Sequence, residues 1–326
     1  MNPGSENVGR MEDRITRRRA LVTLGGAVLG ITASACSHRR SIASSTPGSI
    51  NALTQNTGQL SLLGPSTPVN PGTQPFAFFL VNGQSVVTDA QPSVWFAKDL
   101  ADKATGPVKA SWYPMRGYEA THDTSPRSPL AVGVYVAKID LPSEGIWTIA
   151  ASLMVNGRPL AGTSAVPVTT AKLPAAIQGT AISVPTPVAT TNHRLEEICT
   201  RRPPDRMHYI SLDEALRNGK PTVVSFATPL LCQSQTCGPV VDEQLLVFER
   251  YGPGRANFIH VEEFLPGKDL RPPPATAQNL SPAFKAWGFQ DEPWVIVIDR
   301  NGVIRGRLGP GVTVAALIEA ALRPLL

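Results

Sequence analysis

The sequence predicts two globular domains, the first all-β and the second α/β. The chain has 326 residues, enough for two domains of ordinary size, and 42% of them are hydrophobic, as in globular proteins. Residues 59–170 contain short apolar runs separated by turn residues, which favours an all-β domain. Residues 206–326 alternate strand-like and helix-like runs, which favours an α/β domain.

Residues 1–35 are predicted to be an export signal. The basic run Arg17–Arg19 precedes a mostly apolar stretch, 21–35, that is shorter than the roughly 20 residues of a membrane span. TRRRAL resembles a twin-arginine signal, and ASAC resembles a bacterial lipobox, whose cysteine, here Cys36, becomes lipidated. The resemblance implies a lipoprotein held by its lipid anchor on the outer face of the cell membrane, where disulfides persist. The alternative is simple cleavage before an unmodified Cys36.

Residues 36–58 are small and polar, and we expect a flexible tether there. The following 112 positions of the first domain, 59–170, hold four strand-like runs, PFAFFLVNG, SVWFAKD, AVGVYVAKIDLP and GIWTIAASLMVNG. The Asn-Gly pairs at 82–83 and 156–157 predict tight turns between strands. Strands at this spacing favour a β-sandwich.

The third and fourth runs carry the clearest strand signal. Val132, Val134 and Val136 recur with the period of two that a half-buried strand requires. Tyr135 and Trp147 are expected to be core aromatic residues. The stretch GVYVAKIDLPSEGIWTIAASL resembles the immunoglobulin-like modules of exported bacterial proteins. The resemblance implies an immunoglobulin-like sandwich.

Residues 171–205 are rich in Pro, Ala and Thr, which predicts a semi-extended linker between the domains. Cys199 lies near its end. We expect either an incidental thiol there or an alternative disulfide partner that movement of the linker brings in.

The second domain is predicted from eight elements in order. A capping box at Ser211–Glu214 begins the first helix, because the hydroxyl can cap the helix start and the glutamate can reach back. The remaining elements are a strand at 221–227, a helix at 240–252, a strand at 256–262, a helix at 281–287, strands at 293–299 and 303–308, and a closing helix at 312–326.

Two cysteines and a proline link this domain to a known family. Cys232 and Cys237 lie between the first strand and the following helix, and Cys237-Gly-Pro matches the start of the C-G-P-C motif of thioredoxins. Pro293 opens the third strand, where thioredoxins have a cis proline facing the active site. Residues 206–326 therefore resemble the thioredoxin fold, and the resemblance implies a cis peptide bond before Pro293.

The match departs from the family at two places. Val240 stands where thioredoxins have their second cysteine, so the partner thiol is Cys232 in a C-x4-C arrangement. The tryptophan that usually precedes the first cysteine is also absent. These departures leave the chemistry of the pair open.

The first hypothesis is thiol–disulfide exchange with exported proteins, which needs no cofactor. The start of a helix stabilises a thiolate, and a second thiol resolves a mixed disulfide. We assign Cys237 as the nucleophile and Cys232 as its partner, with the reverse order also open, and Pro293 shapes the substrate groove.

The second hypothesis is copper binding. The chain resembles exported thioredoxin-like proteins of the Sco type, which hold copper with two cysteines and a distant histidine. The corresponding residues here are Cys232, Cys237 and His260. The alternative for His260 is a hydrogen-bonded core residue of its strand.

The third hypothesis is a structural disulfide in a non-catalytic binding module, so the assignment as an enzyme stays open. The formal net charge is +5, and no dense basic stripe with interleaved aromatic residues is present. We therefore expect no nucleic-acid partner.

Overall fold

A computed structural model describes residues 46–326, except residues 66, 118, 120–123, 126, 191–193 and 265–278. The predicted export signal and the lipidation site Cys36 lie outside the described residues. Both predicted domains fall within one compact unit, Ser44–Leu326. Among the described helices, none combines the length and the apolar character that crossing a membrane requires.

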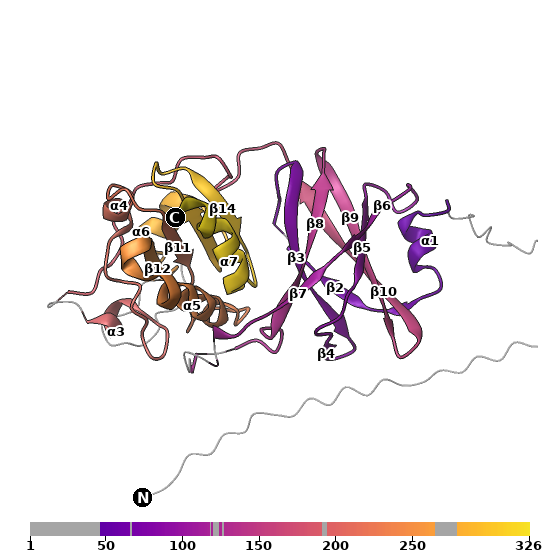
Figure 1. Cartoon of the computed structure of the whole chain (residues 1–326), viewed down its shortest axis with the longest axis horizontal. Coiled ribbons are helices and arrows are strands. Elements are labelled where there is room, and N and C mark those ends of the chain that lie inside the picture. Colours follow the sequence, from indigo (N-terminus) through magenta and orange to yellow (C-terminus); the bar gives the residue numbers. More distant parts are fainter. Residues whose placement is uncertain are drawn as a thin grey trace, which may run out of the picture. The chain divides into compact units, whose positions relative to one another are not determined.

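Residues 58–168 form two β-sheets, as the predicted all-β region requires (Figure 1). One sheet has the strand order β1-β10-β9-β5-β6, and the other has β2-β3-β8-β7 with β4 paired to β3. The bounds are β1 Gly58–Gln59, β2 Ser61–Leu63, β3 Gly72–Asn82, β4 Ser85–Val86, β5 Ser93–Ala97, β6 Thr105–Lys109, β7 Ser111–Pro114, β8 Gly133–Leu141, β9 Gly145–Val155 and β10 Arg158–Val168. Side chains from both sheets share one hydrophobic core.

Strand β8 has the predicted period of two, but the valine face is not the one in this core. Tyr135 and Leu141 are fully buried in it, whereas Lys138 and Asp140 are exposed. Val134 is buried in a different core, together with residues of the α/β part. The start of β8 is therefore buried on both faces, which the alternation alone could not reveal.

The two aromatic residues predicted for the core lie in it. Tyr135 is 0% exposed and Trp147 is 8% exposed. The hydroxyl of Tyr135 accepts a hydrogen bond from the Ala90 backbone N–H at 3.0 Å. Trp147 Nε1 donates to the Ser143 carbonyl at 2.8 Å. Each ring therefore buries its apolar body while its polar atom keeps a partner.

The predicted tether reaches too far along the chain. Ser49 caps a short helix, α1 (Ile50–Thr54), by accepting a hydrogen bond from the Ala52 N–H at 3.2 Å. Ile50 is fully buried, and β1 pairs in parallel with β10. Residues from Ser49 onward therefore belong to the β-rich part, because their apolar side chains have core to pack against.

The predicted linker is extended but packed. The Gln178 N–H donates to the Ile304 carbonyl at 2.9 Å, and the Ala181 N–H donates to the Gly302 carbonyl at 2.8 Å. Helix α3 (Leu195–Ile198) precedes Cys199, which is 0% exposed. The expectation that the linker can swing Cys199 to a partner is wrong, because this thiol is enclosed.

Residues 212–325 form a four-stranded sheet with helices on both faces (Figure 1). The strand order is β12-β11-β13-β14, with β12 parallel to β11 and the other pairs antiparallel. The bounds are α4 Leu212–Ala215, β11 Thr222–Phe226, α5 Cys237–Arg255, β12 Asn257–Val261, α6 Pro282–Trp287, β13 Trp294–Ile298, β14 Ile304–Leu308, α7 Ala315–Leu322 and the 3-10 turn η1 Arg323–Leu325.

The order of these elements agrees with the prediction, and their packing explains it. Strands β11, β12 and β13 are buried along their whole length, so both faces need a covering layer. Helices α5 and α7 share a core with one face, and α4 and α6 share a core with the other. The parallel crossover from β11 through α5 to β12 places the start of α5 at the carboxyl end of β11.

The predicted capping box at Ser211 does not form. Ser211 Oγ makes no capping bond to its own helix and instead accepts from the Thr186 N–H at 2.9 Å. In return, Thr186 Oγ1 accepts from the Leu212 N–H at 3.0 Å. A residue of the packed linker thus caps α4, which local sequence could not show.

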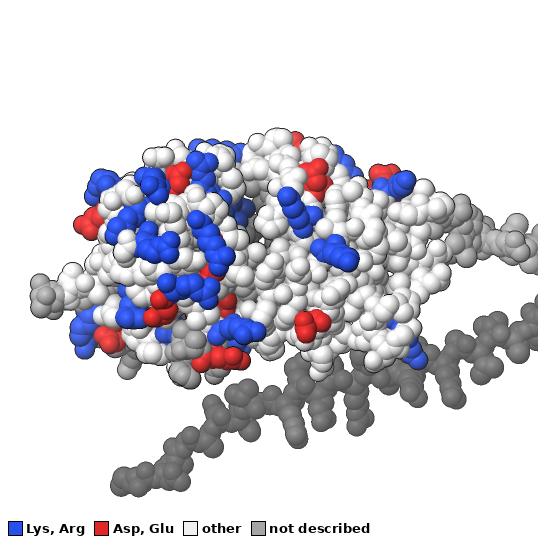
Figure 2. Space-filling view, in the orientation of Figure 1, with Lys and Arg blue, Asp and Glu red and all other residues white. Residues whose placement is uncertain are grey.

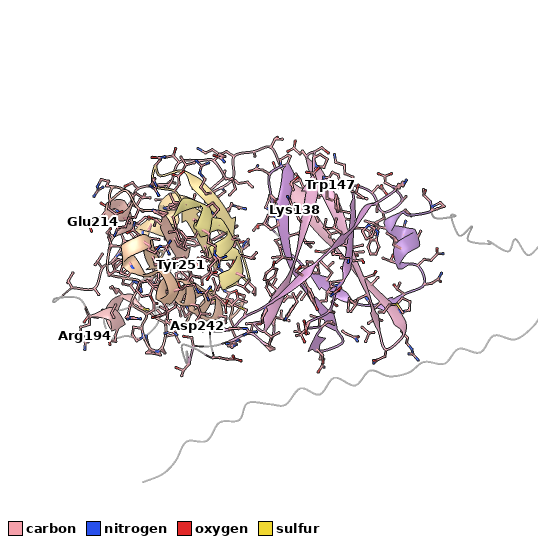
Figure 3. The ribbon with its side chains drawn as sticks, in the orientation of Figure 1. Lys138, Trp147, Arg194, Glu214, Asp242 and Tyr251 are labelled. Carbon is pink, nitrogen blue, oxygen red and sulfur yellow. A yellow bond between two sulfur atoms is a disulfide. The ribbon has the colours of Figure 1, made fainter. Side chains whose placement is uncertain are left out.

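Charged side chains are unevenly distributed. On the face in Figure 2, Lys and Arg gather over the α/β part, whereas the β-rich part is mostly uncharged. A buried ion pair joins the linker to α5: Arg201, from the end of the linker, lies 2.7 Å from Asp242 of α5 (Asp242 is labelled in Figure 3). Both side chains are at most 2% exposed. The pair ties the linker to the helix that begins at Cys237.

We expect Asp242→Ala to lower the free energy of unfolding by about 3–5 kcal/mol, because it leaves the Arg201 guanidinium buried without its carboxylate. Glu249, on the same helix, makes an exposed ion pair with Arg206, and Glu249→Ala is expected to cost at most about 1 kcal/mol. Urea unfolding of both variants measures the difference. Equal losses would contradict a structural role for the buried pair.

Candidate functional site

The two predicted cysteines form a disulfide at the start of α5. Cys232 and Cys237 are bonded, with 6.0 Å between their Cα atoms. The chain turns back between them because the Thr228 carbonyl accepts from the Cys232 N–H at 3.0 Å, and the Cys232 carbonyl accepts from the Gln235 N–H at 3.1 Å. Gln235 takes a positive φ of 55°. These bonds turn the cysteine loop, residues 228–237, so that Cys232 and Cys237 lie within disulfide distance.

The start of α5 is electropositive and free of competing acids. Cys237 is the first residue of α5, which is kinked at Gly252, and its first turn contains no Asp or Glu. Thr236, at the cap position, makes no side-chain capping bond. Unpaired N–H groups at a helix start stabilise negative charge. The site therefore favours a thiolate on Cys237 once the disulfide is reduced.

A glutamate lies beside the disulfide, in the position just before Pro293. The Glu292–Pro293 peptide bond is cis, as predicted. A carboxylate oxygen of Glu292 and the sulfur atoms of Cys232 and Cys237 all lie within 4.8 Å of one another. The residue as a whole is partly exposed, but its Oε2 atom is shielded from solvent and has no hydrogen-bond partner in the described structure. An acid group thus faces the sulfur atoms.

Glu292 and Glu263 form an acid pair that retains protons near neutral pH. Burial, followed by the negative charges of Glu263 and Glu262, raises the pKa of Glu292 well above its usual range. Burial also raises the pKa of Glu263 to about 7, although its hydrogen bond with Glu292 opposes the rise. Two carboxyl groups in hydrogen-bond contact need a proton between them. The group facing the disulfide is therefore able to donate a proton.

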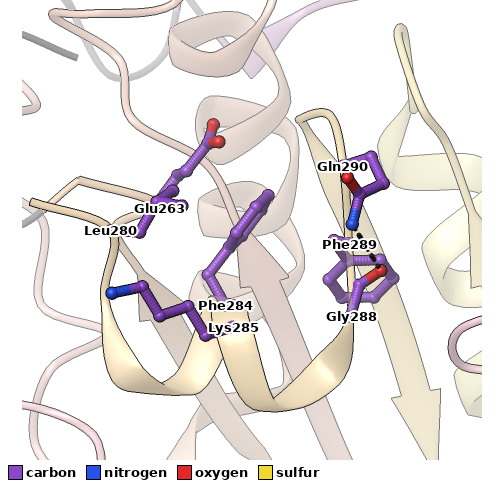
Figure 4. Close-up of a pocket in the computed structure, with 7 residues that line it drawn as sticks. All are labelled: Glu263, Leu280, Phe284, Lys285, Gly288, Phe289 and Gln290. Carbon is purple, nitrogen blue, oxygen red and sulfur yellow. Dashed lines mark hydrogen bonds between the residues drawn. The ribbon is translucent and has the colours of Figure 1, made fainter. Parts of the chain in front are cut away.

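A small cavity is lined in part by Glu263. It has a volume of about 240 Å³ and is lined by Glu263, Leu280, Phe284, Lys285, Gly288, Phe289 and Gln290 (Figure 4). In Figure 4, Glu263 and Leu280 lie across from Gln290 and Phe289, with Phe284 between them. The lining combines the aromatic rings of Phe284 and Phe289 with the polar side chains of Glu263, Lys285 and Gln290.

The disulfide itself is scarcely exposed. Cys232 is 7% exposed and Cys237 is 0% exposed. The connection between β7 and β8 contacts the cysteine loop, since the Ser128 N–H donates to the Gln235 carbonyl at 2.9 Å. Met115, from the same connection, shares a core with both cysteines. Of the two cysteines, only Cys232 has any solvent-exposed surface.

A second cluster of reactive groups lies at the end of β12. We call Cys199, Asp205, His208 and His260 the inner cluster; their ligand-type atoms all lie within 4.8 Å of one another, and all four residues are buried. Asp205 Oδ2 lies 2.7 Å from His260 Nδ1 and 3.2 Å from Cys199 Sγ. The four groups come from the packed linker, the segment before α4 and β12.

Burial and charge together set the protonation of the inner cluster. Burial alone would raise the pKa of Asp205 and lower that of His260, but their mutual attraction outweighs it. The pKa of Asp205 is therefore well below its usual range, and that of His260 is well above. Burial, reinforced by the charge of Asp205, raises the pKa of Cys199 to about 12. Without a bound cation, Cys199 is thus a thiol at neutral pH.

The structure joins Cys232 to Cys237 and brings Glu292, the residue before Pro293, close to them, but it groups His260 elsewhere. The proposed copper ligand His260 belongs to the inner cluster, and its Nε2 atom lies 2.9 Å from the Ala227 carbonyl. Both of its ring nitrogens are therefore engaged away from the disulfide. In the described part of the chain, the group close to the two sulfur atoms is instead Glu292.

Sequence reasoning missed Glu292, Asp205 and His208. Glu292 could have been predicted from the sequence, because it directly precedes Pro293, and a proline at the start of the third strand was expected to face the cysteine pair. Asp205 and His208 had a weaker one, since they lie close to Cys199 in sequence but within and just after a segment interpreted as linker. The linker packs in a way that local composition does not encode.

Comparisons with known proteins add little. No family model matches the chain, and no curated protein matches it. Among solved structures, the M1 domain from titin is 8% identical, with a TM-score of 0.18, and the match covers 36% of this chain and 95% of that domain. A likeness at that TM-score supports no conclusion about fold or function.

The acid pair predicts that stability falls as pH rises through 7. Because the folded-state pKa values of Glu263 and Glu292 are raised, the stability that they contribute is complete below their unfolded pKa of about 4.3. The contribution of Glu263 is lost as pH rises through about 7, its folded pKa, with a slope of at most about 1.4 kcal/mol per pH unit. Glu263→Gln removes a titrating carboxyl and should flatten the decline between pH 5 and 8.

Urea unfolding across this pH range measures the effect, with the exposed Glu249→Gln as the matched control. The control is expected to follow the wild-type curve. A Glu263→Gln curve that also follows the wild type would show that the carboxyl is charged throughout.

Proposed function

We propose that this protein carries out thiol–disulfide exchange through Cys232 and Cys237. The observation that carries the proposal is a disulfide at the electropositive start of α5 with the carboxyl of Glu292 against its sulfur atoms. These are the two elements that such exchange needs, namely stabilisation of a thiolate and a proton donor for the departing sulfur.

The proposal extends to the family of the α/β part. Its strand order, the disulfide between β11 and α5 and the cis peptide before β13 support a thioredoxin-like fold for residues 206–326. The two sheets around one core support an immunoglobulin-like sandwich for the β-rich part. The sequence resemblances of residues 1–36 support lipid anchoring at Cys36 on the extracytoplasmic face, where the partners are exported proteins with thiols or disulfides.

Exposure favours Cys232 as the sulfur that a substrate thiolate attacks, the reverse of our first assignment. The new bond joins the substrate sulfur to Cys232 Sγ, and the bond from Cys232 to Cys237 breaks. Cys237 leaves as a thiolate at the start of α5 and takes a proton from Glu292. A second substrate thiol then attacks the mixed disulfide and releases Cys232, so the substrate dithiol is oxidised and the protein disulfide is reduced.

A structural disulfide is the second candidate, and the burial of the pair favours it. Cys237 is fully enclosed and Cys232 is nearly so, and an enclosed bridge exchanges slowly with external thiols. This candidate assigns the cysteine loop to stabilising the start of α5. Copper binding by Cys232, Cys237 and His260 is not retained, because His260 lies in the inner cluster and not in the group that contains the two sulfur atoms.

The reduction potential of the pair separates the two candidates. We expect a value above about −300 mV, because potentials below that mark typical structural bridges. The folded full-length protein is equilibrated with glutathione or dithiothreitol buffers, quenched in acid and alkylated under denaturing conditions. Mass spectrometry then counts the alkyl groups on each chain. Reduction adds two alkyl groups, over a constant background from Cys199 and from unlipidated Cys36.

Glu292→Gln is the matched variant, since it preserves shape but cannot supply a proton. It should slow the approach to equilibrium by about 100-fold, while Glu249→Gln leaves the rate unchanged. A potential below about −300 mV would assign the disulfide to structure and end the exchange proposal.

A further inference from the structure

We propose that Cys199, Asp205, His208 and His260 form a buried binding site for a zinc ion. The proposal concerns the inner cluster and does not depend on the chemistry of Cys232 and Cys237. It rests on the spacing of four donor atoms, on one ring nitrogen without a partner and on the hydrogen bonds that orient the ligands.

All four donor atoms lie within 4.8 Å of one another, and three of their separations are close to those of a tetrahedral site. Zinc lies about 2.0–2.3 Å from nitrogen, oxygen and sulfur ligands, which places neighbouring donors about 3.3–3.8 Å apart. Asp205 Oδ2 is 3.2 Å from Cys199 Sγ and 3.7 Å from His208 Nε2, and Cys199 Sγ is 3.9 Å from His260 Nδ1. The separation of 2.7 Å between Asp205 Oδ2 and His260 Nδ1 would widen by less than about 1 Å.

His208 supplies an unpartnered donor aimed at the cluster. The residue is 2% exposed, and its Nε2 atom has no hydrogen-bond partner in the described structure. Leaving a buried polar atom without a partner costs about 1–3 kcal/mol. Its nearest carboxylate oxygen, Asp205 Oδ2, is 3.7 Å away, beyond hydrogen-bond distance. A metal ion between the two atoms would satisfy both.

The surrounding hydrogen bonds orient the other ligands as metal sites require. The Ala227 carbonyl can only accept, so His260 Nε2, at 2.9 Å, must carry the proton, and Nδ1 is the atom left to bind. Asp205 Oδ1 accepts from the Met207 N–H at 2.9 Å, which directs Oδ2 into the cluster. Metal-binding histidines and carboxylates typically have such outer partners.

Charge balance and ligand chemistry both favour zinc. One thiolate, one carboxylate and two neutral imidazoles neutralise a divalent cation, and a neutral buried group avoids the large cost of isolated charge. A mixed set of one sulfur, two nitrogens and one oxygen suits a borderline ion in four-coordinate geometry, and it is poorly suited to calcium or magnesium.

The test uses the full-length protein expressed in medium supplemented with cobalt, a spectroscopic substitute for zinc. Loading during synthesis matters because the four ligands are at most 2% exposed. We expect one cobalt per chain, with a thiolate-to-cobalt charge-transfer band and the strong visible bands of tetrahedral cobalt. Expression in zinc medium should likewise give one zinc per chain by metal analysis.

Two ligand variants and one control make the assignment specific. Cys199→Ser should abolish the charge-transfer band, and His208→Gln should abolish metal binding while the protein stays folded, because it replaces an atom that has no partner. The double variant Cys232→Ser/Cys237→Ser should keep the band, which separates the inner cluster from the disulfide as the source of sulfur. Circular dichroism confirms folding, and if Cys199→Ser does not fold, His208→Gln decides.

Absence of stoichiometric cobalt and zinc from the folded wild-type protein would overturn the proposal and leave a metal-free network in which His260 is protonated. A charge-transfer band that survives Cys199→Ser, or cobalt that His208→Gln retains in full, would also overturn it.

Discussion

The proximity of an uncharged carboxyl to the disulfide at the start of α5 is the constraint on which the account depends. A charged Glu292 in this position would face Glu263 and Glu262 in a poorly hydrated space, and the burial that raises its pKa would penalise it. A protonated Glu292 avoids this cost and gives the departing Cys237 sulfur a proton donor. The start of α5 and Glu292 both act on the sulfur of Cys237. The helix start stabilises its negative charge, and Glu292 donates the proton that neutralises it.

The end of strand β12 connects this site to the inner cluster. His260 points to Asp205 and Cys199, whereas Glu262 accepts hydrogen bonds from the N–H and hydroxyl of Thr200 at 2.6 and 2.8 Å. Thr200 Oγ1 also accepts from the Leu230 N–H at 3.2 Å, within the cysteine loop. Thr200 of the packed linker thus lies between the disulfide site and the inner cluster. A change in either group of side chains therefore alters the surroundings of Thr200.

The elements that local sequence could predict are those with strong periodicity or a local turn signal. The β-rich region and the strands and helices of residues 221–326 belong to this group, whereas the cis peptide before Pro293 and the pairing of Cys232 with Cys237 were implied by the resemblance to thioredoxins. The remaining features depend on contacts between distant segments. Arg201 and Asp205 lie in a Pro-rich stretch that looks solvated, and only its packing against β12 and α5 buries them. The same packing replaces the expected cap at Ser211 with Thr186, and it encloses the thiol of Cys199.

The central claim is that Cys232 is attacked by an external thiolate while Cys237 departs. Its most direct test is to trap the mixed disulfide on single-cysteine variants of the pair that also carry Cys36→Ser, and to follow it by intact-protein mass spectrometry with a cysteine peptide disulfide. The account predicts that Cys237→Ser, which retains Cys232, forms the mixed disulfide readily and that Cys232→Ser does so far more slowly. Equal trapping at both positions would contradict the assigned order, and no trapping at either would contradict exchange itself.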